Sequence, residues 1–294
     1  MRICSTLKSN LESIVFRMDW MALKIQVIGL GVVGSAQAYL LKQLKHSIYG
    51  YDPFLKLKPD LGIVNESEIK KDVDITFICT PEDYVEATIR KLTNEKVSGL
   101  YVIKSSVPPG TTRLLREKYN IHICHNPEFL REKHAFEDVL NPNRILIGKC
   151  CHKHGNLLSN LYRPIKAPIF LTTPIETETV KILSNVLRAY IITFWNNVDL
   201  LCDRLGISTE KTAKLLNQHK TLCKWEGGDW GIKHFGKPYN GKCLPKDMRQ
   251  LIQLFDDLNL NSTMFKEIQK FNDKLDLKMR VYVDWNITNT RISV

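Results

Sequence analysis

A glycine pattern directly after a short apolar run constrains the fold of this chain more than any other feature. The apolar run, residues 25–28, is short and rich in β-branched side chains, as in a buried parallel strand. Gly29, Gly31 and Gly34 then follow the pattern G-x-G-x-x-G, and a helical pattern continues to about Lys45. Together these features predict the strand–turn–helix unit of a dinucleotide-binding fold.

Each part of such a unit has its own role. The first glycine allows a tight turn, the second lets a pyrophosphate approach the backbone, and the third lets helix and strand pack closely. The start of the helix, at Val32 and Val33, then faces the phosphates. Asp52 ends the next predicted strand, residues 47–51, where a carboxylate would accept a ribose 2′-hydroxyl and repel a 2′-phosphate. The sequence therefore favours NAD over NADP, with an ordinary turn aspartate before Pro53 as the alternative.

Further apolar runs, at 73–79, 100–103, 121–124 and 144–147, alternate with helical patterns. This alternation predicts an α/β fold with a Rossmann-like, doubly wound parallel sheet. From Thr172 onward the patterns are mainly helical. We therefore expect a leader extension over residues 1–23, an NAD-binding Rossmann domain over 24–171 and a helical central domain over 172–294.

Composition and charge limit the classes of partner that the chain is expected to bind. The 294 residues carry a net charge of +11, with 44% hydrophobic and 25% charged residues, which is a globular composition. No long basic run and no apolar stretch of roughly 18 residues occurs, so we expect neither a nucleic-acid partner nor a membrane span. The eight cysteines contain no CxxC pair, and Cys150 and Cys151 are neighbours. We therefore predict no metal site and no disulfide framework, and a reducing cytoplasm fits best.

Two segments place polar residues at helical spacing. NPEFLRE, residues 126–132, holds two carboxylates four residues apart, which would share one face of a helix. A surface ion-pair cluster is the alternative for this segment. Lys181 and Asn185 also lie four apart, within a helical pattern over residues 176–205. A lysine on a solvated helix face is the alternative there.

GKCLPKD, residues 241–247, is the most suggestive segment. Cys243 follows a glycine-rich loop and precedes Pro245, which suits the first turn of a helix. A helix N-terminus and the flanking Lys242 and Lys246 favour the thiolate. The thiolate is the nucleophilic form of cysteine. A buried structural thiol is the alternative.

In their order and spacing, these segments resemble the UDP-glucose/GDP-mannose dehydrogenase family. The resemblance runs from Lys24 to about Phe271, through GLGVVG, ICTP, KSSVPPGTT, NPEFLRE, NPNRILIG, ETETVKILSN and GKCLPKD. It implies an enzyme that oxidises the C6 alcohol of a nucleotide sugar, UDP-glucose above all, to the carboxylate. Two NAD are consumed, and the intermediates are a cysteine thiohemiacetal and a thioester. The resemblance also implies a homodimer formed through the helical domain.

Residue roles follow by position from this resemblance. Cys243 would be the nucleophile, and Lys181 and Asn185 would stabilise the oxyanion at C6. Glu128 and Asp247 would hold or activate water, with Ser106 assisting. The cofactor set would add Thr80, Pro81, Ser106 and Glu132 to Gly29, Gly31, Val32, Val33, Gly34 and Asp52. The substrate set would comprise Glu128, Phe129, Leu130, Lys181, Asn185, Tyr239 and Gly241.

Three departures from the family pattern stand out. The loop at 236–243 reads GKPYNGKC, the stretch between Asp52 and Val73 is short, and nothing in residues 272–294 resembles a further nucleotide-binding domain. The sequence therefore predicts a compact or truncated nucleotide-sugar 6-dehydrogenase. Two alternatives stay open, namely a catalytically impaired NAD-binding remnant and a single-step hydroxyacid dehydrogenase. A single-step hydroxyacid dehydrogenase would need no thiol, so Cys243 argues against that alternative.

Overall fold

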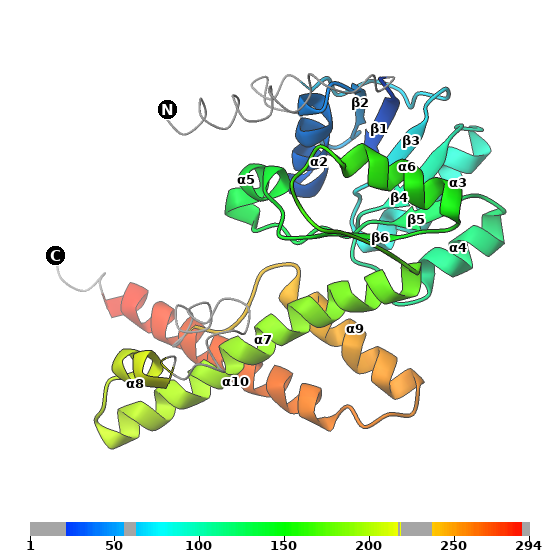
Figure 1. The fold of residues 1–294 in the computed structure, drawn as a ribbon. Helices are drawn as coiled ribbons and strands as arrows, with labels where there is room; N and C mark the ends of the chain where they lie inside the picture. The colour runs from blue at the N-terminus through cyan, green and yellow to red at the C-terminus, as the bar shows by residue number, and fades with distance from the viewer. Residues whose placement is uncertain (1–21, 56–62, 217, 219–236, 290–294) are drawn as a thin grey trace, which may run out of the picture. The chain divides into compact units, whose positions relative to one another are not determined.

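The apolar runs of the first half of the chain form one sheet. In the computed structural model, which describes residues 22–55, 63–216, 218 and 237–289, the strand order is β2-β1-β3-β4-β5-β6-β7 (Figure 1). The strands are β1 (Lys24–Ile28), β2 (Ser47–Tyr51), β3 (Ile75–Ile78), β4 (Leu100–Ile103), β5 (Ile123–His125), β6 (Ile145–Gly148) and β7 (Ile169–Thr172). The helical segments of this unit are α2 (Val32–Gln43), α3 (Glu82–Asn94), α4 (Thr111–Tyr119), η2 (Glu132–His134), α5 (Ala135–Leu140) and α6 (His152–Tyr162).

Strands β1 to β5 are parallel, which confirms the predicted Rossmann-like sheet. Strand β6 departs from that pattern because it runs antiparallel to β5, through the pairing of His125 with Gly148. The connection from β5 to β6 contains η2 and the short α5 but no helix that crosses the sheet. The chain therefore enters β6 from the same side of the sheet at which β5 ended. Strand β7 is parallel to β6 and forms one edge of the sheet, with Phe170 and Leu171 exposed.

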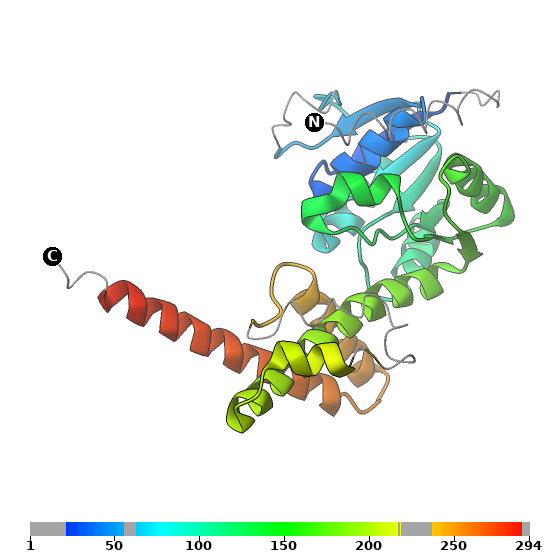
Figure 2. The same cartoon turned by 60° about the vertical axis from the view of Figure 1, so that its left-hand side comes forward.

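The core of this unit lies on both faces of the sheet. Successive strand residues alternate, so that Phe77 packs in one apolar cluster and Ile78 in the other. The first cluster includes residues from α2, α5 and α6, and the second includes residues from α3 and α4. Figure 2 shows helices on both faces of the sheet, as a doubly wound fold requires.

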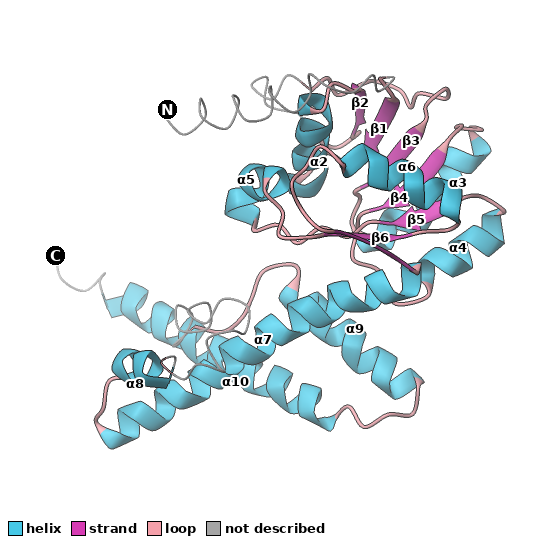
Figure 3. Cartoon of the chain, in the orientation of Figure 1, coloured by secondary structure: helices cyan, strands magenta, loops and turns pink. Residues whose placement is uncertain are grey.

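The other described residues are mainly helical (Figure 3). Its helices are α7 (Pro174–Leu205), α8 (Thr209–Leu216), α9 (Leu244–Asp257) and α10 (Thr263–Asn289). Gly206, with φ of +64°, follows the end of α7, and Ser208 Oγ accepts a hydrogen bond from Lys211 N. The left-handed Gly206 thus follows the last turn of α7, and Ser208 caps the start of α8. None of the helices among the described residues combines the length and apolarity of a membrane-spanning segment.

The chain divides into two compact units between Lys181 and Ile182, whereas the sequence places the boundary at Thr172. The difference arises because the first turns of α7 pack with the sheet unit. Thr177 Oγ1 lies 2.8 Å from His125 Nδ1, at the end of β5. Most of the predicted leader, residues 1–23, lies outside the described residues.

A buried carboxylate on α7 caps another helix of the sheet unit. Glu178 is fully buried, and its two oxygens accept the N–H groups of Gly110 at 2.6 Å and Thr112 at 2.8 Å. The Thr112 hydroxyl also donates to Glu178 at 2.5 Å. These donors belong to the start of α4, where helical N–H groups have no acceptor within the helix. Burial raises the pKa of Glu178, although the hydrogen bonds from Thr112 and Gly110 oppose that rise.

Replacing Glu178 by alanine should lower the free energy of unfolding by about 2–4 kcal/mol, because it leaves buried N–H donors without an acceptor. Urea-induced unfolding followed by circular dichroism measures this loss. Glu210→Ala on α8 is the control, since Glu210 is exposed and pairs with Lys214 one turn along the same helix. Equal unfolding midpoints for the two variants would remove Glu178 from this structural role.

Candidate active site

The glycine-containing loop between β1 and α2 has the geometry that its sequence pattern predicts. Gly29 has φ of +85°, and a Cβ there would lie 2.9 Å from the backbone of Cys79 and Thr80. A Cβ on Gly34 would lie 1.8 Å from the carbonyl oxygen of Gly29. A Cβ on Gly31, by contrast, would meet no atom within 4 Å. Two glycines therefore permit close packing within the protein, and the third borders open space.

That open space adjoins the start of α2. Gly31 precedes the helix, and no side chain caps it. The first helical hydrogen bond runs from Ser35 N to Gly31 O at 2.9 Å. The N–H groups of Val32, Val33 and Gly34 thus have no acceptor within the helix, which is the arrangement that binds phosphate at helix N-termini.

Asp52 is tied to the same loop. Its carboxylate accepts hydrogen bonds from Leu30 N at 2.8 Å and from Phe54 N at 3.0 Å. The Asn65 side chain bonds both backbone groups of Asp52, at 2.9 and 2.8 Å. The Asp52 carboxylate is therefore fixed beside the glycine-containing loop, at the carboxyl end of β2.

The loops after β3 and β4 reach the same edge of the sheet. Thr80 and Pro81 follow β3, with Pro81 directly before α3, and Ser105 and Ser106 follow β4. Ser105 Oγ donates to the carbonyl oxygen of Thr80 at 2.6 Å, so the two loops are joined. Ligands bind at the carboxyl ends of strands in open α/β sheets. The predicted cofactor residues of β1 to β4 thus converge at one edge.

Glu128 forms a buried ion pair. Lys181 Nζ on α7 lies 2.9 Å from Glu128 Oε1, and both side chains are largely shielded from solvent. Burial acts to raise the pKa of Glu128, but the Lys181 charge and a hydrogen bond from Leu130 N outweigh it, so the pKa lies below its ordinary value. Lys181 Nζ also lies 5.3 Å from the centre of the Phe129 ring. Glu128 is therefore ionised at neutral pH and paired with a cation.

Glu132 does not share this environment. Residues 126–131 form a loop, so the two carboxylates of NPEFLRE do not share a helix face as they would in a helix. Glu132 begins the short η2 segment and is exposed. Arg131 pairs with Asp138 at 2.6 Å rather than with either glutamate. The structure thus separates Glu128 from Glu132, because the tertiary contact with Lys181 decides where the loop lies.

A buried polar network beneath this loop was not foreseen from the sequence. Lys104 Nζ donates to Asn126 Oδ1 at 2.9 Å, and Tyr162 donates to the same oxygen at 2.6 Å. Asn126 Nδ2 donates to the carbonyl oxygen of Leu146 at 2.7 Å. Burial lowers the pKa of Lys104 to about 8 and that of His125 to about 3. In the sequence, the one sign of this network is Lys104, a lysine directly after the apolar run at 100–103.

In the second unit, the structure joins Asn185 and Asp247. Asn185 Nδ2 donates to Asp247 Oδ2 at 2.5 Å, and both side chains are buried. Lys246 Nζ lies 3.1 Å from the other oxygen of Asp247. Cys243 is exposed and directly precedes α9, with Pro245 in its first turn. The predicted thiol thus stands at a helix N-terminus, one turn before a buried carboxylate.

Two further predicted residues lie in the loop before α9. Gly241 has φ of +81° and is exposed, and a Cβ there would meet no atom within 4 Å. Tyr239 is buried, and its backbone N–H and carbonyl both bond to the side chain of Asn272, at 2.7 and 2.9 Å. Tyr239 therefore anchors this loop to α10, while Gly241 stays exposed.

The chain is similar to known proteins over parts of both units. The NAD-binding domain of the UDP-glucose/GDP-mannose dehydrogenase family matches residues 63–166, and the central domain of that family matches residues 175–274. UDP-glucose 6-dehydrogenase YwqF of Bacillus subtilis is 29% identical over an alignment of 296 positions, gaps included, that covers 85% of this chain and 66% of the relative. UDP-glucose 6-dehydrogenase of Campylobacter jejuni is 30% identical over 224 residues, or 71% of this chain and 55% of the relative.

A solved structure gives the same result. The UDP-glucose dehydrogenase of the archaeon Pyrobaculum islandicum superposes with a TM-score of 0.76 at 29% identity, over 87% of this chain and 69% of that one. The chain spans just under two thirds of YwqF and about half of the Campylobacter relative. The two matched domains together cover more than half of the chain and occur in the family's order. The chain therefore belongs to the UDP-glucose/GDP-mannose dehydrogenase family, and NAD is its cofactor.

Proposed function

We propose that this chain oxidises the C6 alcohol of a nucleotide sugar, with UDP-glucose as the substrate, to the corresponding carboxylate. The observation that carries the proposal is the position of Cys243 at the start of α9, one turn before the buried Asp247. A two-step oxidation to an acid needs a covalent trap for the aldehyde and a group that directs water to it. A thiol and a carboxylate are suited to these two tasks.

The cofactor residues proposed here fit NAD. The space at Gly31 and the uncapped start of α2 would accommodate the pyrophosphate, and Asp52 would accept the ribose hydroxyls. Thr80, Pro81, Ser106 and Glu132 complete the proposed set. When bound, NAD⁺ would supply the hydride acceptor for each of the two oxidations.

The first oxidation removes a proton from the C6 hydroxyl and a hydride from C6. Lys181 and Asn185, one turn apart on α7, would stabilise the negative charge that develops on the C6 oxygen. The Cys243 thiolate then adds to the aldehyde carbon, and the carbonyl oxygen takes up a proton to give a thiohemiacetal. The second oxidation gives a thioester.

Hydrolysis of the thioester completes the proposed reaction. Water attacks the thioester carbon, the C–S bond breaks and the Cys243 thiol is released. Overall, one alcohol, one water and two NAD⁺ would give one acid, two NADH and two protons. Glu128 and Asp247 would hold this water, with Ser106 assisting, because an ionised carboxylate accepts its hydrogen bonds. Phe129, Leu130, Tyr239 and Gly241 are the remaining proposed substrate contacts.

We also propose that the helical unit forms a homodimer. Support comes from large apolar side chains that are exposed along α7 and α8, namely Leu200, Leu201, Leu205, Leu215 and Leu216. Large exposed apolar side chains mark interaction surfaces where they gather in one patch. Replacing Leu201 and Leu205 by glutamate should convert a dimer to a monomer in analytical ultracentrifugation. Identical sedimentation of variant and parent would remove this surface from the assembly.

Replacing Cys243 by serine should abolish acid formation while NAD affinity is unchanged, because a serine hydroxyl is far less nucleophilic than a thiolate. NADH released per UDP-glucose, with mass spectrometry of the sugar product, measures the effect. The parent should release two NADH per sugar, against one for a single-step dehydrogenase and none for an inactive remnant. Cys202→Ser, the same change elsewhere in the helical unit, should retain two. Undiminished acid formation by Cys243→Ser would exclude the covalent route.

The glycines of the nucleotide loop should respond differently to alanine. In Gly31→Ala the new methyl group meets no protein atom, so the melting temperature should hold while NAD affinity falls at least about tenfold, or ~1.4 kcal/mol. In Gly34→Ala the methyl group overlaps the Gly29 carbonyl, so the melting temperature itself should fall. Calorimetry and thermal unfolding give the two readouts. Unchanged NAD affinity in Gly31→Ala would contradict the proposed pyrophosphate position.

A further inference from the structure

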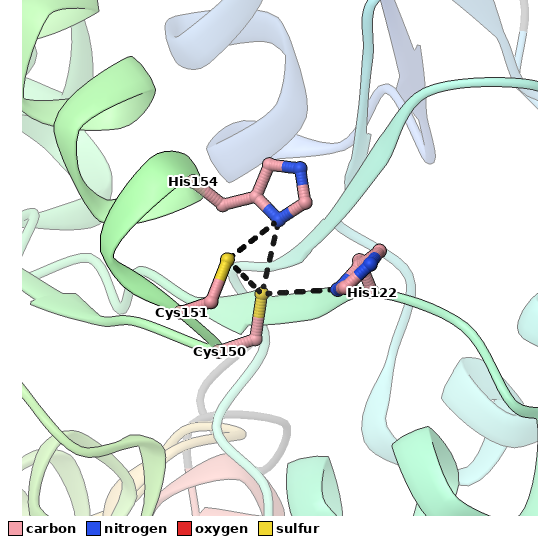
Figure 4. A group of neighbouring side chains, drawn as sticks. All are labelled: His122, Cys150, Cys151 and His154. Carbon is pink, nitrogen blue, oxygen red and sulfur yellow. Dashed lines mark hydrogen bonds between the residues drawn. The ribbon is translucent and has the colours of Figure 1, made fainter.

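Four metal-binding side chains converge in the first unit, although the sequence predicts no metal site. His122, Cys150, Cys151 and His154 place one ligand atom each within 4.8 Å of all the others (Figure 4). His154 Nδ1 lies 3.3 Å from both Cys150 Sγ and Cys151 Sγ. The two sulfurs are 4.0 Å apart, and Cys150 Sγ lies 3.8 Å from His122 Nδ1.

We propose that these four residues bind one zinc ion in a structural site. Zn–S bonds of about 2.3 Å and Zn–N bonds of about 2.0–2.1 Å place tetrahedral ligand atoms roughly 3.3–3.8 Å apart. Three of these four separations fall within that range, and the sulfur–sulfur separation lies slightly above it. His122 is exposed, so its ring can rotate to close the remaining, longer separations.

The fold explains how ligands that are distant in sequence meet. The antiparallel register pairs His125 with Gly148. In such a register, the residue three before His125 lies opposite the residue three after Gly148, so His122 lies opposite Cys151. Cys151 directly precedes α6, and His154 lies in the first turn of that helix. The reversal of β6 thus brings a histidine before β5 against two cysteines and a histidine at the start of α6.

The N-terminus of α6 favours a thiolate ligand at this position. No side chain caps the start of α6, and the positive end of a helix favours a thiolate beside it. Two thiolates and two neutral imidazoles balance the charge of Zn²⁺, and binding releases the two thiol protons. Cys124 Sγ lies 3.7 Å from Cys150 Sγ and accepts a hydrogen bond from the Cys150 N–H. A third sulfur, outside the ligand set, therefore helps to hold Cys150 in place.

The proposed site has a structural rather than a catalytic design. Four protein ligands fill a tetrahedral shell and leave no position for substrate. His122 precedes β5, whereas Glu128 follows the other end of that strand, so the cluster lies at the edge opposite the proposed cofactor residues. The ion would tie β5 to the β6–α6 connection.

The test uses the full chain purified under reducing conditions in zinc-containing medium. Elemental analysis should find one zinc per chain, and cobalt added to the chelator-treated protein should give the absorption bands of a thiolate-bound tetrahedral site. Zinc returned to the chelator-treated protein should raise its melting temperature. Cys151→Ser and His154→Ala should each weaken zinc binding more than about 100-fold, since losing a ligand costs more than losing an outer-shell partner.

His152→Ala is the matched control, because His152 lies on the same turn of α6 but outside the cluster. It should retain one zinc, and calorimetric NAD binding reports whether each variant is folded. The proposal fails if the parent holds no stoichiometric zinc or if zinc content is the same in Cys151→Ser and His152→Ala. Under these reducing conditions, a disulfide between Cys150 and either Cys124 or Cys151 would also overturn it.

Discussion

Buried positive charge at the carboxyl end of β4 sets the electrostatics of the sheet unit. Lys104 is almost fully buried, and its hydrogen-bond partner, Asn126, carries no charge. The nearby carboxylate of Glu128 already pairs with Lys181, so a single negative charge compensates the positive charges of both Lys104 and Lys181. A buried charge without full compensation is costly, and the low pKa of Lys104, about 8, records that cost. The excess positive charge complements a ligand that is anionic or becomes so during reaction.

The same group of residues also fixes the backbone around the site. Asn126 accepts hydrogen bonds from Lys104 and Tyr162 and donates one to Leu146 O, so it joins β4, α6 and β6. The loop that carries Glu128 begins at this asparagine, and its position therefore depends on three separate elements. Substitutions of the core residues that pack beneath Asn126 should therefore shift Glu128, even though those residues do not themselves contact a bound ligand.

Local patterns predicted the elements of this protein well and their long-range contacts less well. The glycine pattern specified the β1–α2 turn because Gly29 and Gly34 are constrained by backbone atoms of the turn itself and by Cys79 and Thr80 after β3. NPEFLRE begins as a loop, and Glu128 contacts Lys181, 53 residues away in sequence, which is a contact that periodicity does not encode. The His–Cys cluster was missed because a strand register, and not a short sequence spacing, assembles it.

Strand β7 has a consequence for the solubility of the protein. Among the described residues no strand pairs with its outer side, so backbone groups there resemble those that template intermolecular sheets. Phe170 and Leu171 add exposed apolar surface, at 53% and 38%. Pro168 and Pro174, which cannot donate backbone hydrogen bonds, bracket the four-residue strand. Any added strand could therefore pair over only about 13 Å, which limits edge-to-edge association through β7.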